Sequence, residues 1–232
     1  AKAGTIIRNP ELAKTLRQLS KRGPKAFYSG PVARSIVTAV QKSPVSAGDM
    51  TLGDLAKYKA KEQNAVCKPY RIYVVCGMGP PSSGATTILQ MLGMLERFDL
   101  GAMGKDNARS WHLISEAMRL AYADREKYLG DPDFVEVPVE AMLDRGYLVE
   151  RSKLIDPERA ATSYNAGPPA NAKGRRPGMS GEVAGTTHFV AIDGKGRMAS
   201  MTSTIEGPFG SNQIAGGFFL NNELTDFTFT PG

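Results

Sequence analysis

The strongest constraint in this 232-residue sequence is a single change of pattern along the chain. Residues 1–154 mostly carry apolar side chains at helical spacing, whereas residues 155–185 are rich in Pro, Gly, Asn and Ala and keep neither a helical nor a strand period. From Thr186 onward, β-branched and aromatic residues gather in short runs. A helical part, a linker and a β-rich part predict an α+β fold with a structural boundary at Gly185-Thr186.

Signals for helix starts and stops support the helical part. Asn9 precedes Pro10 in the order expected for an N-cap and a first helical residue, and Gly23 follows as a stop. Thr51 and Asp54 have the spacing of a capping pair. Further helices are expected from Pro31, from about Gly84 to Phe98, and over about 107–129.

The longest of these predicted helices, over about 107–129, should cover part of the core. The side chains expected to face inward are Trp111, Ile114, Met118 and Ala121. Earlier in the chain, Tyr70–Cys76 has the composition of a strand. The following motif GPPSSGA resembles a phosphate loop but lacks the Gly-Lys-Ser/Thr ending, so it predicts a turn from strand to helix.

The first β-rich residues predict a hairpin. If residues 194–196 form a three-residue loop whose last glycine is left-handed, Asp193 pairs with Arg197. The same register places Thr186 opposite Thr204, whereas a slip of one residue would bring a serine there instead. Further strands are expected over 217–220 and 227–229.

The charge of the chain gives no sign of a nucleic-acid partner. Its 29 Lys and Arg and 23 Asp and Glu residues give a formal net charge of +6, but the two signs are interspersed along the sequence. One local cluster, Lys173, Arg175 and Arg176, lacks the interleaved aromatic residues of a single-strand binder. No apolar run is long enough to span a membrane, and no signal peptide opens the sequence.

Two cysteines, Cys67 and Cys76, lie on either side of the predicted strand. Neither has a CxxC partner or a nearby histidine, so no metal site is expected. Two free thiols and one disulfide are equally compatible with the sequence, and the redox compartment stays open.

The position of Thr186 has a chemical consequence. A threonine hydroxyl is a weak nucleophile, and an adjacent free α-amine activates it only if the threonine is the first residue of a chain. Cleavage between Gly185 and Thr186 would supply that amine, and a glycine leaves its carbonyl sterically open. Thr204 would add a second hydroxyl beside the first. On the residues alone, the β propensity of a Thr-Thr pair at a strand start explains the same pattern.

Several segments in order resemble one known family. TTHFVAID, TSTIEGPFG and GFFLNNELTDF are similar to the start of the small subunit of γ-glutamyltranspeptidases. Upstream, NPELAKTLRQLSKRGPKAFYSG, GPPSSGATTILQMLGMLE and HLISEAMRLAYADREKYLGDPDF resemble the large subunit of the same family. Together the segments span nearly the whole chain.

The resemblance implies a fold and an organisation. The family consists of N-terminal-nucleophile hydrolases with an αββα sandwich, made as one precursor that cuts itself into two subunits. Residues 1–185 would be the C-terminal part of the large subunit, with 155–185 as its flexible linker. Residues 186–232 would be the N-terminal part of the small subunit.

The resemblance also implies roles for individual residues. Thr186 matches the nucleophile, which cleaves the precursor and then takes the γ-glutamyl group as an ester, and Thr204 matches the threonine that supports it. Glu223 matches a Gln or Glu position and Asp226 matches the family's Asp, which together hold the substrate α-amino group. Carboxylates suit an ammonium ion. A solvated turn after a strand is the alternative interpretation for both acids.

Two further positions, Glu206 and His188, lie near the nucleophile in the sequence. Glu206 stands where many members have Asn, so either the pocket gains an acid or the side chain turns away, and the substrate preference stays open. His188 lies two residues after the nucleophile and on the same face of the strand. The family needs no histidine base, so we interpret His188 as structural, with a role in precursor processing as the alternative.

The expected activity is hydrolysis or transfer of γ-glutamyl groups from glutathione and other γ-glutamyl amides. The acceptor would be an amino acid, a peptide or water, with no cofactor and no metal. One alternative is a glutaryl-type (cephalosporin) acylase of the same family, which the acids Glu206, Glu223 and Asp226 disfavour. The other is a non-catalytic family member, which the intact Thr186 and Thr204 disfavour.

The two ends of the sequence predict a fragment, since Ala1 replaces an initiator Met and Gly232 directly follows a strand-like run. In the family, an early large-subunit Arg, a small-subunit Ser pair and a Gly pair of the oxyanion hole complete the site, and none falls within residues 1–232. We therefore expect the remaining parts of both subunits as partners and an inactive fragment. The resemblance implies a periplasmic or secreted protein.

Overall fold

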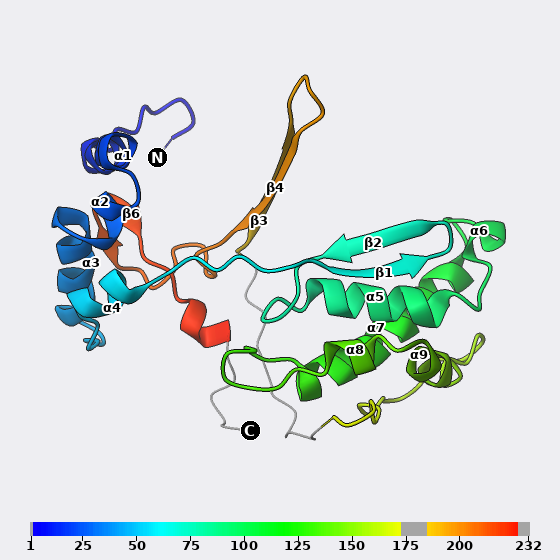
Figure 1. The fold of residues 1–232 in the computed structure, drawn as a ribbon. Helices are drawn as coiled ribbons and strands as arrows, with labels where there is room; N and C mark the ends of the chain where they lie inside the picture. Colours follow the sequence, from blue (N-terminus) through cyan, green and yellow to red (C-terminus); the bar gives the residue numbers. More distant parts are fainter. Residues whose placement is uncertain (1, 173–184, 227–232) are drawn as a thin grey trace. The chain divides into compact units, whose positions relative to one another are not determined.

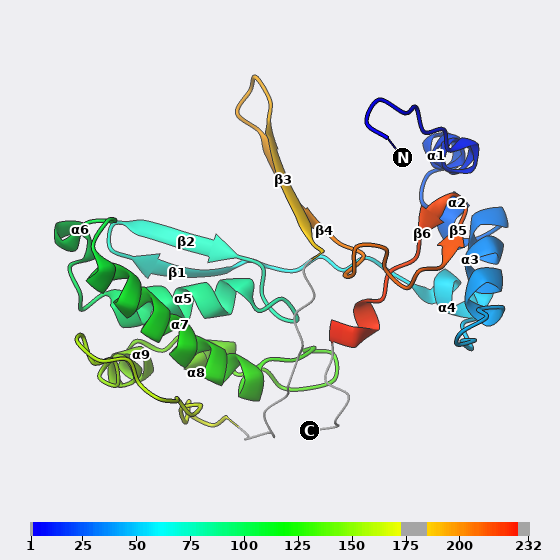
Figure 2. The ribbon, with the colours of Figure 1, turned by 180° about the vertical axis from the view of Figure 1, so that it is seen from behind.

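The chain folds into a mixture of helices and short antiparallel strands, seen from opposite sides in Figures 1 and 2. This computed structural model describes residues 2–172 and 185–226, without the side chains of residues 225 and 226. It contains two compact units, one made of Ala1–Ala60 with Ser180–Phe229 and the other of Lys61–Met179 with Thr230–Gly232. We call them unit 1 and unit 2. Among the described residues, no helix is long and apolar enough to cross a membrane.

Unit 1 begins with four helices, α1 (Pro10–Arg22), α2 (Lys25–Tyr28), α3 (Pro31–Gln41) and α4 (Leu52–Lys57). Of these, α1, α3 and α4 start at the predicted signals and α2 was not predicted. The Asn9 side chain accepts a hydrogen bond from the amide of Leu12 at 2.9 Å, and Gly23 ends α1 with φ +64°. The carboxylate of Asp54 accepts from the amide of Thr51 at 2.8 Å, so the predicted capping pair is confirmed.

The core of unit 1 joins these helices to a late segment of the chain. Strands β5 (Ile214–Ala215) and β6 (Phe218–Phe219) form a small antiparallel hairpin beside α2, α3 and α4 (Figure 1). The buried residues of this core are Val32, Ile36 and Ala215, with Phe27, Ala39, Met50, Leu55, Phe218 and Leu220 packed around them. Burial of these apolar side chains holds residues 214–220 against the first helices.

Helix α1 also binds the turn of this hairpin directly. Asn9 Nδ2 donates to the carbonyl of Gly217 at 2.7 Å, and the Thr15 hydroxyl donates to the carbonyl of Gly216 at 2.8 Å. Both glycines have a positive φ, +57° at Gly216 and +83° at Gly217. A Cβ at Gly217 would overlap the backbone amide of Leu12, so α1 and the turn approach each other only because this residue is glycine.

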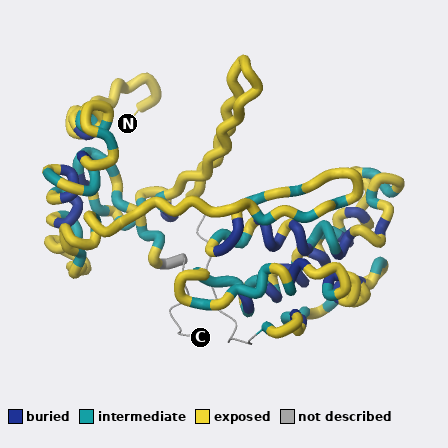
Figure 3. Tube along the Cα trace, in the orientation of Figure 1, coloured by how far each residue is buried: buried dark blue, intermediate teal, exposed yellow. Residues whose placement is uncertain are grey.

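The predicted hairpin after Thr186 is confirmed. Strands β3 (Thr187–Ile192) and β4 (Met198–Ser203) pair antiparallel, with the amide of Asp193 donating to the carbonyl of Arg197 at 3.0 Å. Gly196 takes the left-handed conformation with φ +76°. The Asp193 carboxylate accepts hydrogen bonds from the Arg197 side chain at 2.6 Å and from the Arg197 amide at 3.0 Å. These bonds close the loop and lower the pKa of Asp193. Every residue of both strands is exposed, as the uniform colour of this hairpin in Figure 3 shows.

Unit 2 contains a hairpin where one strand was predicted. The chain reverses at residues 71–72 between β1 (Val66–Tyr70) and β2 (Tyr73–Gly77), so the single strand over Tyr70–Cys76 is wrong. No glycine, proline or asparagine marks this turn, and Arg71 itself takes a positive φ of +53°. Cys67 and Cys76 are direct partners across the ladder and form a disulfide, with their Cα atoms 4.1 Å apart. Of the two alternatives left by the sequence, the structure therefore has the disulfide.

The rest of unit 2 is helical. Its helices are α5 (Gly84–Leu95), α6 (Leu100–Met103), α7 (Ala108–Tyr128), α8 (Val139–Met142) and α9 (Arg145–Ser152), of which α6, α8 and α9 were not predicted. Helix α5 packs against α7 and α9 in both views (Figures 1 and 2). GPPSSGA joins β2 to α5, so the predicted turn is confirmed. The buried apolar core consists of Met94, Leu95, Phe98, Leu113, Ala117, Leu120, Ala121, Leu148 and Ile155.

The inward face of α7 differs from the predicted one. Trp111 and Met118 are exposed by 59% and 43%, whereas Ala121 is fully buried and Ile114 packs partly buried against the core, as expected. The buried face is formed by Ser110, Leu113, Glu116, Ala117, Leu120, Ala121, Asp124 and Tyr128. The prediction failed because it reserved the core face for apolar residues, and here two carboxylates share that face.

The predicted linker over 155–185 is only partly described, and its first part is not loose. Residues 155–172 contain no regular helix or strand, as predicted. However, Ile155 is 1% exposed, and Gly167 and Pro169 are also buried. The amides of Ala161 and Gly167 donate to side chains of α7 instead of to a helix or strand partner. The expected strand over 227–229 lies outside the described residues.

Candidate functional site

The predicted site residues all belong to unit 1, and the turn after β4 organises them. The Thr204 hydroxyl accepts a hydrogen bond from the amide of Glu206 at 2.7 Å, which closes a local side-chain turn. Glu206 takes a positive φ of +66°, a conformation in which asparagine is better tolerated than glutamate. The chain therefore leaves β4 in a tight turn over residues 204–207.

A second segment is fastened to this turn by Asn222. The amide of Asn222 donates to the carbonyl of Ile205 at 3.3 Å, and its side-chain oxygen accepts from the buried amide of Gly207 at 3.0 Å. The β5–β6 hairpin delivers residue 222 to this point, since the amide of Ser211 donates to the carbonyl of Leu220 at 2.8 Å. Residues 204–207 and 221–223, separate in sequence, thus lie side by side.

Gly185 packs directly against the same turn. A Cβ at this position would overlap the backbone carbonyl oxygen of Glu206 and would lie 3.4 Å from the carbonyl carbon of Gly207. No side chain larger than hydrogen fits without displacing backbone. The peptide that joins Gly185 to Thr186 therefore begins at a position fixed by the 204–207 turn.

The register of the β3–β4 hairpin places Thr186 at the end of this hairpin that leads into the 204–207 turn. The ladder runs to the pair Thr187 and Ser203, in the predicted register. Continued by one residue, this register sets the exposed Thr186 opposite Thr204. The structure thus brings together Gly185, Thr186 and Thr204, three of the predicted site residues.

The three predicted acids are described to different extents. Glu206 is only 4% exposed, so its side chain does not point to solvent. Glu223 is half-buried and opens a short 3₁₀ helix, Glu223–Asp226, with its amide donating to Asn221 Oδ1 at 3.1 Å. The side chain of Asp226 lies outside the described residues. Glu206 and Glu223 therefore sit on the two segments that Asn222 joins.

His188 uses both ring nitrogens within the hairpin. Its Nδ1 lies 2.8 Å from the Thr202 hydroxyl, and its Nε2 lies 3.1 Å from the Ser200 hydroxyl. Both hydroxyls belong to β4, so the ring bridges the two strands instead of turning toward Thr186. This arrangement supports the structural interpretation of His188. The sequence did not predict a role for either hydroxyl or for Asn222, because no spacing signal marks a contact between separate segments.

The described residues contain no group of three His, Cys, Asp or Glu side chains that could hold a metal ion. The basic cluster Lys173, Arg175 and Arg176 lies outside the residues that the structure describes.

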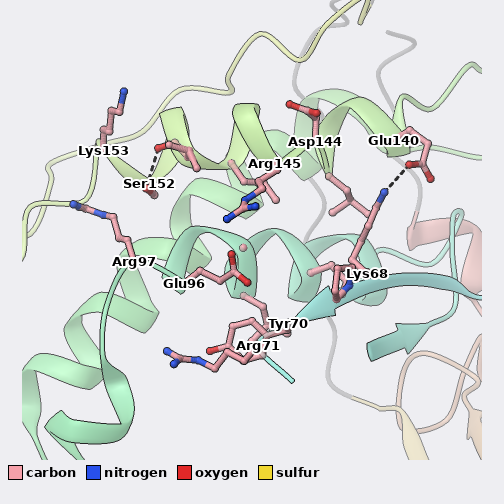
Figure 4. A pocket seen from close by; sticks show the side chains of 17 residues that line it. Lys68, Tyr70, Arg71, Glu96, Arg97, Glu140, Asp144, Arg145, Ser152 and Lys153 are labelled. Atoms are coloured by element: carbon pink, nitrogen blue, oxygen red, sulfur yellow. Dashed lines mark hydrogen bonds and ion pairs between the residues drawn. The ribbon is translucent and has the colours of Figure 1, made fainter. Parts of the chain in front are cut away.

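Unit 2 contains a cavity of about 1060 Å³ beside β1, α5 and α9 (Figure 4). Basic and acidic side chains share its rim, and Lys68 donates to Glu140 there at 2.6 Å. The labelled charged residues around it include Arg71, Glu96, Arg97 and Arg145. None of the predicted site residues lines this cavity, so the candidate site and the cavity are distinct features.

Asn222→Ala tests the link between the two segments. The substitution leaves the buried amide of Gly207 without its acceptor, so we expect the free energy of unfolding to fall by about 1–3 kcal/mol. Urea denaturation of the full-length protein measures this loss, and hydrogen exchange at Gly207 locates it. Asn222→Asp keeps an acceptor oxygen and should lose less. Equal stability of the native protein and Asn222→Ala would show that the link does not hold the turn.

Comparisons of the sequence and the structure with known proteins all point to one family. The family model described as gamma-glutamyltranspeptidase matches residues 1–232. The glutathione hydrolase proenzyme of Escherichia coli (strain K12) is 38% identical over 235 residues, which cover all of this chain and 38% of that protein. This chain therefore spans about two fifths of that relative's length.

Two solved structures extend the comparison. Helicobacter pylori gamma-glutamyltranspeptidase matches with a TM-score of 0.66 and 39% identity, over 71% of this chain and 46% of that chain. The cephalosporin acylase from Bacillus halodurans matches with a TM-score of 0.82 and 28% identity, over 100% of this chain and 39% of that chain. The full-length family match and the sequence identity agree, and the chain belongs to the γ-glutamyltranspeptidase family.

Proposed function

We propose that this chain carries the self-cleavage site and the nucleophile of a γ-glutamyl hydrolase and transferase. One observation supports this most directly: Gly185 has no room for a side chain against the Glu206 carbonyl, and Thr186 follows it at the position opposite Thr204. The Gly-Thr peptide thus directly precedes a ladder whose register, continued by one residue, would set Thr186 opposite the Thr204 hydroxyl. Membership of the family and the likeness to proteins named glutathione hydrolase support the same activity.

The first proposed step is cleavage of the chain. The Thr186 hydroxyl oxygen adds to the carbonyl carbon of Gly185, the peptide C–N bond breaks, and the nitrogen gains a proton as the α-amine of Thr186. The resulting ester between Gly185 and Thr186 is hydrolysed by water. Two chains result, one ending in a Gly185 carboxylate and one beginning with a free Thr186. The Thr204 hydroxyl supports the attacking oxygen.

The second proposed step is the transfer reaction. The new α-amine of Thr186 takes the proton of its own hydroxyl, and the oxygen attacks the γ-carbonyl of a substrate such as glutathione. The leaving amine departs with a proton, which leaves a γ-glutamyl ester on Thr186. Water then releases glutamate, or an amino acid or peptide amine accepts the group.

The proposed substrate pocket uses the three acids near the turn. Glu223 and Asp226 receive the α-ammonium group of the γ-glutamyl substrate, and Glu206 adds a third carboxylate. The burial of Glu206 and its place beside the Asn222 link support this assignment. Three carboxylates favour a substrate with a cationic amine and disfavour binding of a substrate without that amine.

The proposed architecture is the αββα sandwich, with residues 1–185 in the large subunit and 186–232 in the small one. The β3–β4 hairpin supports this because its apolar side chains, such as Phe189, Val190 and Met201, are exposed on both faces. A two-stranded ribbon is marginal alone and needs further strands or helices. The remaining parts of both subunits would supply them. The Cys67–Cys76 disulfide supports an oxidising location, periplasmic or secreted.

A second candidate is an acylase acting on glutaryl-type amides. The structural likeness to a cephalosporin acylase over the whole chain favours it. Such substrates lack the α-amine, so the three acids would have no cation to match. We therefore rank this activity below γ-glutamyl transfer.

Thr186→Ala tests the nucleophile in the full-length protein. Because one hydroxyl performs both steps, the variant should remain a single chain and show no γ-glutamyl transfer. Thr204→Ala removes a supporting hydrogen bond worth about 0.5–1.5 kcal/mol, so both steps should slow by only about 2- to 12-fold. Intact mass and a γ-glutamyl amide assay measure the two effects. Two chains from Thr186→Ala would exclude Thr186 as the nucleophile.

Gly185→Ala tests the fixed position of the cleaved bond. The new methyl group would overlap the Glu206 carbonyl, so the backbone must shift and self-cleavage should slow by about 100-fold, the usual effect of a misplacement near 1 Å. The time course of the two-chain product, followed by mass, gives the rate. Gly194→Ala is the matched control, since a Cβ there meets nothing within 4 Å. Normal cleavage of Gly185→Ala would contradict the proposed role of this packing.

Asp226→Asn tests recognition of the substrate amine. The change should weaken use of γ-glutamyl amides by about 1.5–3 kcal/mol and spare or improve use of glutaryl amides of the same length. Glu206→Asn should shift the preference in the same direction, because Glu206 is buried beside the turn. Values of kcat/KM for the matched substrate pair decide the matter. An unchanged preference in Asp226→Asn would remove this residue from the pocket.

A further inference from the structure

Helix α7 carries two buried carboxylates that the proposed reaction does not use. Glu116 is 2% exposed and Asp124 is 1% exposed. Buried carboxylates are stable only when their oxygens are fully hydrogen-bonded or paired. Many of their partners lie far along the chain, within residues 161–167, which precede the Gly185-Thr186 bond.

Glu116 holds the first part of this segment. Its carboxylate accepts from the Tyr164 hydroxyl at 2.6 Å and from the amide of Ala161 at 2.9 Å, and it pairs with Arg119 at 2.7 Å. Arg119 in turn donates to the carbonyls of Ala161 and Thr162 at 2.7 and 3.1 Å. Burial alone would raise the pKa of Glu116, but these hydrogen bonds lower it below its usual value. Burial and the bond to Glu116 raise the pKa of Tyr164 to about 12, so its hydroxyl remains a donor.

Asp124 holds the end of the segment. Its carboxylate accepts from the amide of Gly167 at 2.8 Å and from the Tyr147 hydroxyl at 2.7 Å, and it pairs with Arg151 at 3.0 Å. The Tyr128 hydroxyl donates to the carbonyl of Gly167 at 2.5 Å. A Cβ at Gly167 would overlap the Tyr147 hydroxyl and lie 2.8 Å from Arg151 Cδ, so only glycine fits.

We propose that α7 is an anchor that keeps residues 161–167 bound in unit 2 both before and after the chain is cut at Gly185-Thr186. In this inference, which rests on the proposed self-cleavage, any rearrangement that follows cleavage is confined to residues after Gly167. Glu116, Asp124 and Tyr128 are positioning residues, since they touch neither the cleaved bond nor the substrate. The new carboxyl end of the large subunit stays attached to its own core through them.

The anchor also sets the length of chain that precedes the proposed cleavage site. It leaves roughly 18 residues between the last anchored residue, Gly167, and Gly185, whereas loss of the anchor would leave roughly 30 from Ile155 in the core. Because Gly185 is held by the 204–207 turn and is the direct neighbour of Thr186, this difference in length should change the rate of self-cleavage by no more than about twofold. Turnover by protein that is already cut should not change, because the proposed nucleophile belongs to unit 1.

Hydrogen exchange of the full-length protein tests the anchor. We expect the amides of Ala161 and Gly167 to exchange slowly in the cut protein and equally slowly in uncut Thr186→Ala. Fast exchange at both amides in either form would overturn the proposal. If the Gly185-Thr186 bond is never cut but the two amides exchange slowly, the proposed self-cleavage fails and the anchor in the intact chain stands.

Variants on α7 separate the anchor from general stability. Glu116→Gln should raise exchange in residues 161–167 at least tenfold and change the rate of self-cleavage by no more than about twofold, with unchanged turnover once cut. Glu126→Gln is the matched control, because Glu126 is an exposed carboxylate on the same helix. Unchanged exchange in Glu116→Gln would overturn the proposal.

A milder pair of variants covers the case in which Glu116→Gln does not fold. Tyr128→Phe removes only the hydroxyl that donates to Gly167, so exchange should rise several-fold near Gly167 and not elsewhere in unit 2. Tyr122→Phe, on the exposed side of the same helix, is its control and should leave exchange unchanged. A rise spread evenly over all of unit 2 in Tyr128→Phe would indicate a general loss of stability and would count against the anchor.

Discussion

The candidate site depends on the close approach of α1 to the Gly216-Gly217 turn. Two side chains of the helix, Asn9 and Thr15, donate to the two carbonyls of that turn, and the glycines allow the backbones to meet. With the turn held, the β5–β6 hairpin projects its end to the position where Asn222 binds the 204–207 turn. Gly185 then packs on that turn. A contact at the first helix thus determines the surroundings of Thr186, far away in sequence.

Buried charge plays a different part in unit 2. A carboxylate in a protein interior costs several kcal/mol unless hydrogen bonds and a counter-charge replace its water. Glu116 and Asp124 meet that condition because each has an arginine partner, a tyrosine hydroxyl and a backbone amide. The same bonds provide an irregular segment with the partners that a helix or strand would otherwise supply. Polar burial on α7 therefore replaces secondary structure over residues 161–167.

The β3–β4 hairpin shows how register can be set without burial. Apolar residues lie on both of its faces and all are exposed, so a hydrophobic pattern does not choose between registers. The choice comes from the two ends of the hairpin. At one end Asp193 and Gly196 define the loop, and nearer the other His188 bridges two hydroxyls of β4. These polar contacts define a register that, continued by one residue, sets Thr186 opposite Thr204.

Local chemistry was enough to predict much of this protein. The caps at Asn9 and Thr51, the loop at 194–196 and the switch to strands at Thr186 all depend on residues within a few positions of each other, and the sequence contains that information directly. The family resemblance rests on such segments as well. By itself, the sequence determined where α1, α3, α4, α5 and α7 begin and that Thr186 directly precedes β3.

Tertiary structure decided what depends on partners distant in the chain. The turn at Arg71 has no turn residue and forms because β1 and β2 pair, and the disulfide follows from that pairing. The face of α7 is set by donors from residues 161–167, which allow Glu116 and Asp124 to be buried. Likewise, Asn222 and Gly185 gain their significance only from the turn they both contact. The energy of a buried polar group depends on whether a partner reaches it, and the fold alone decides where such partners lie.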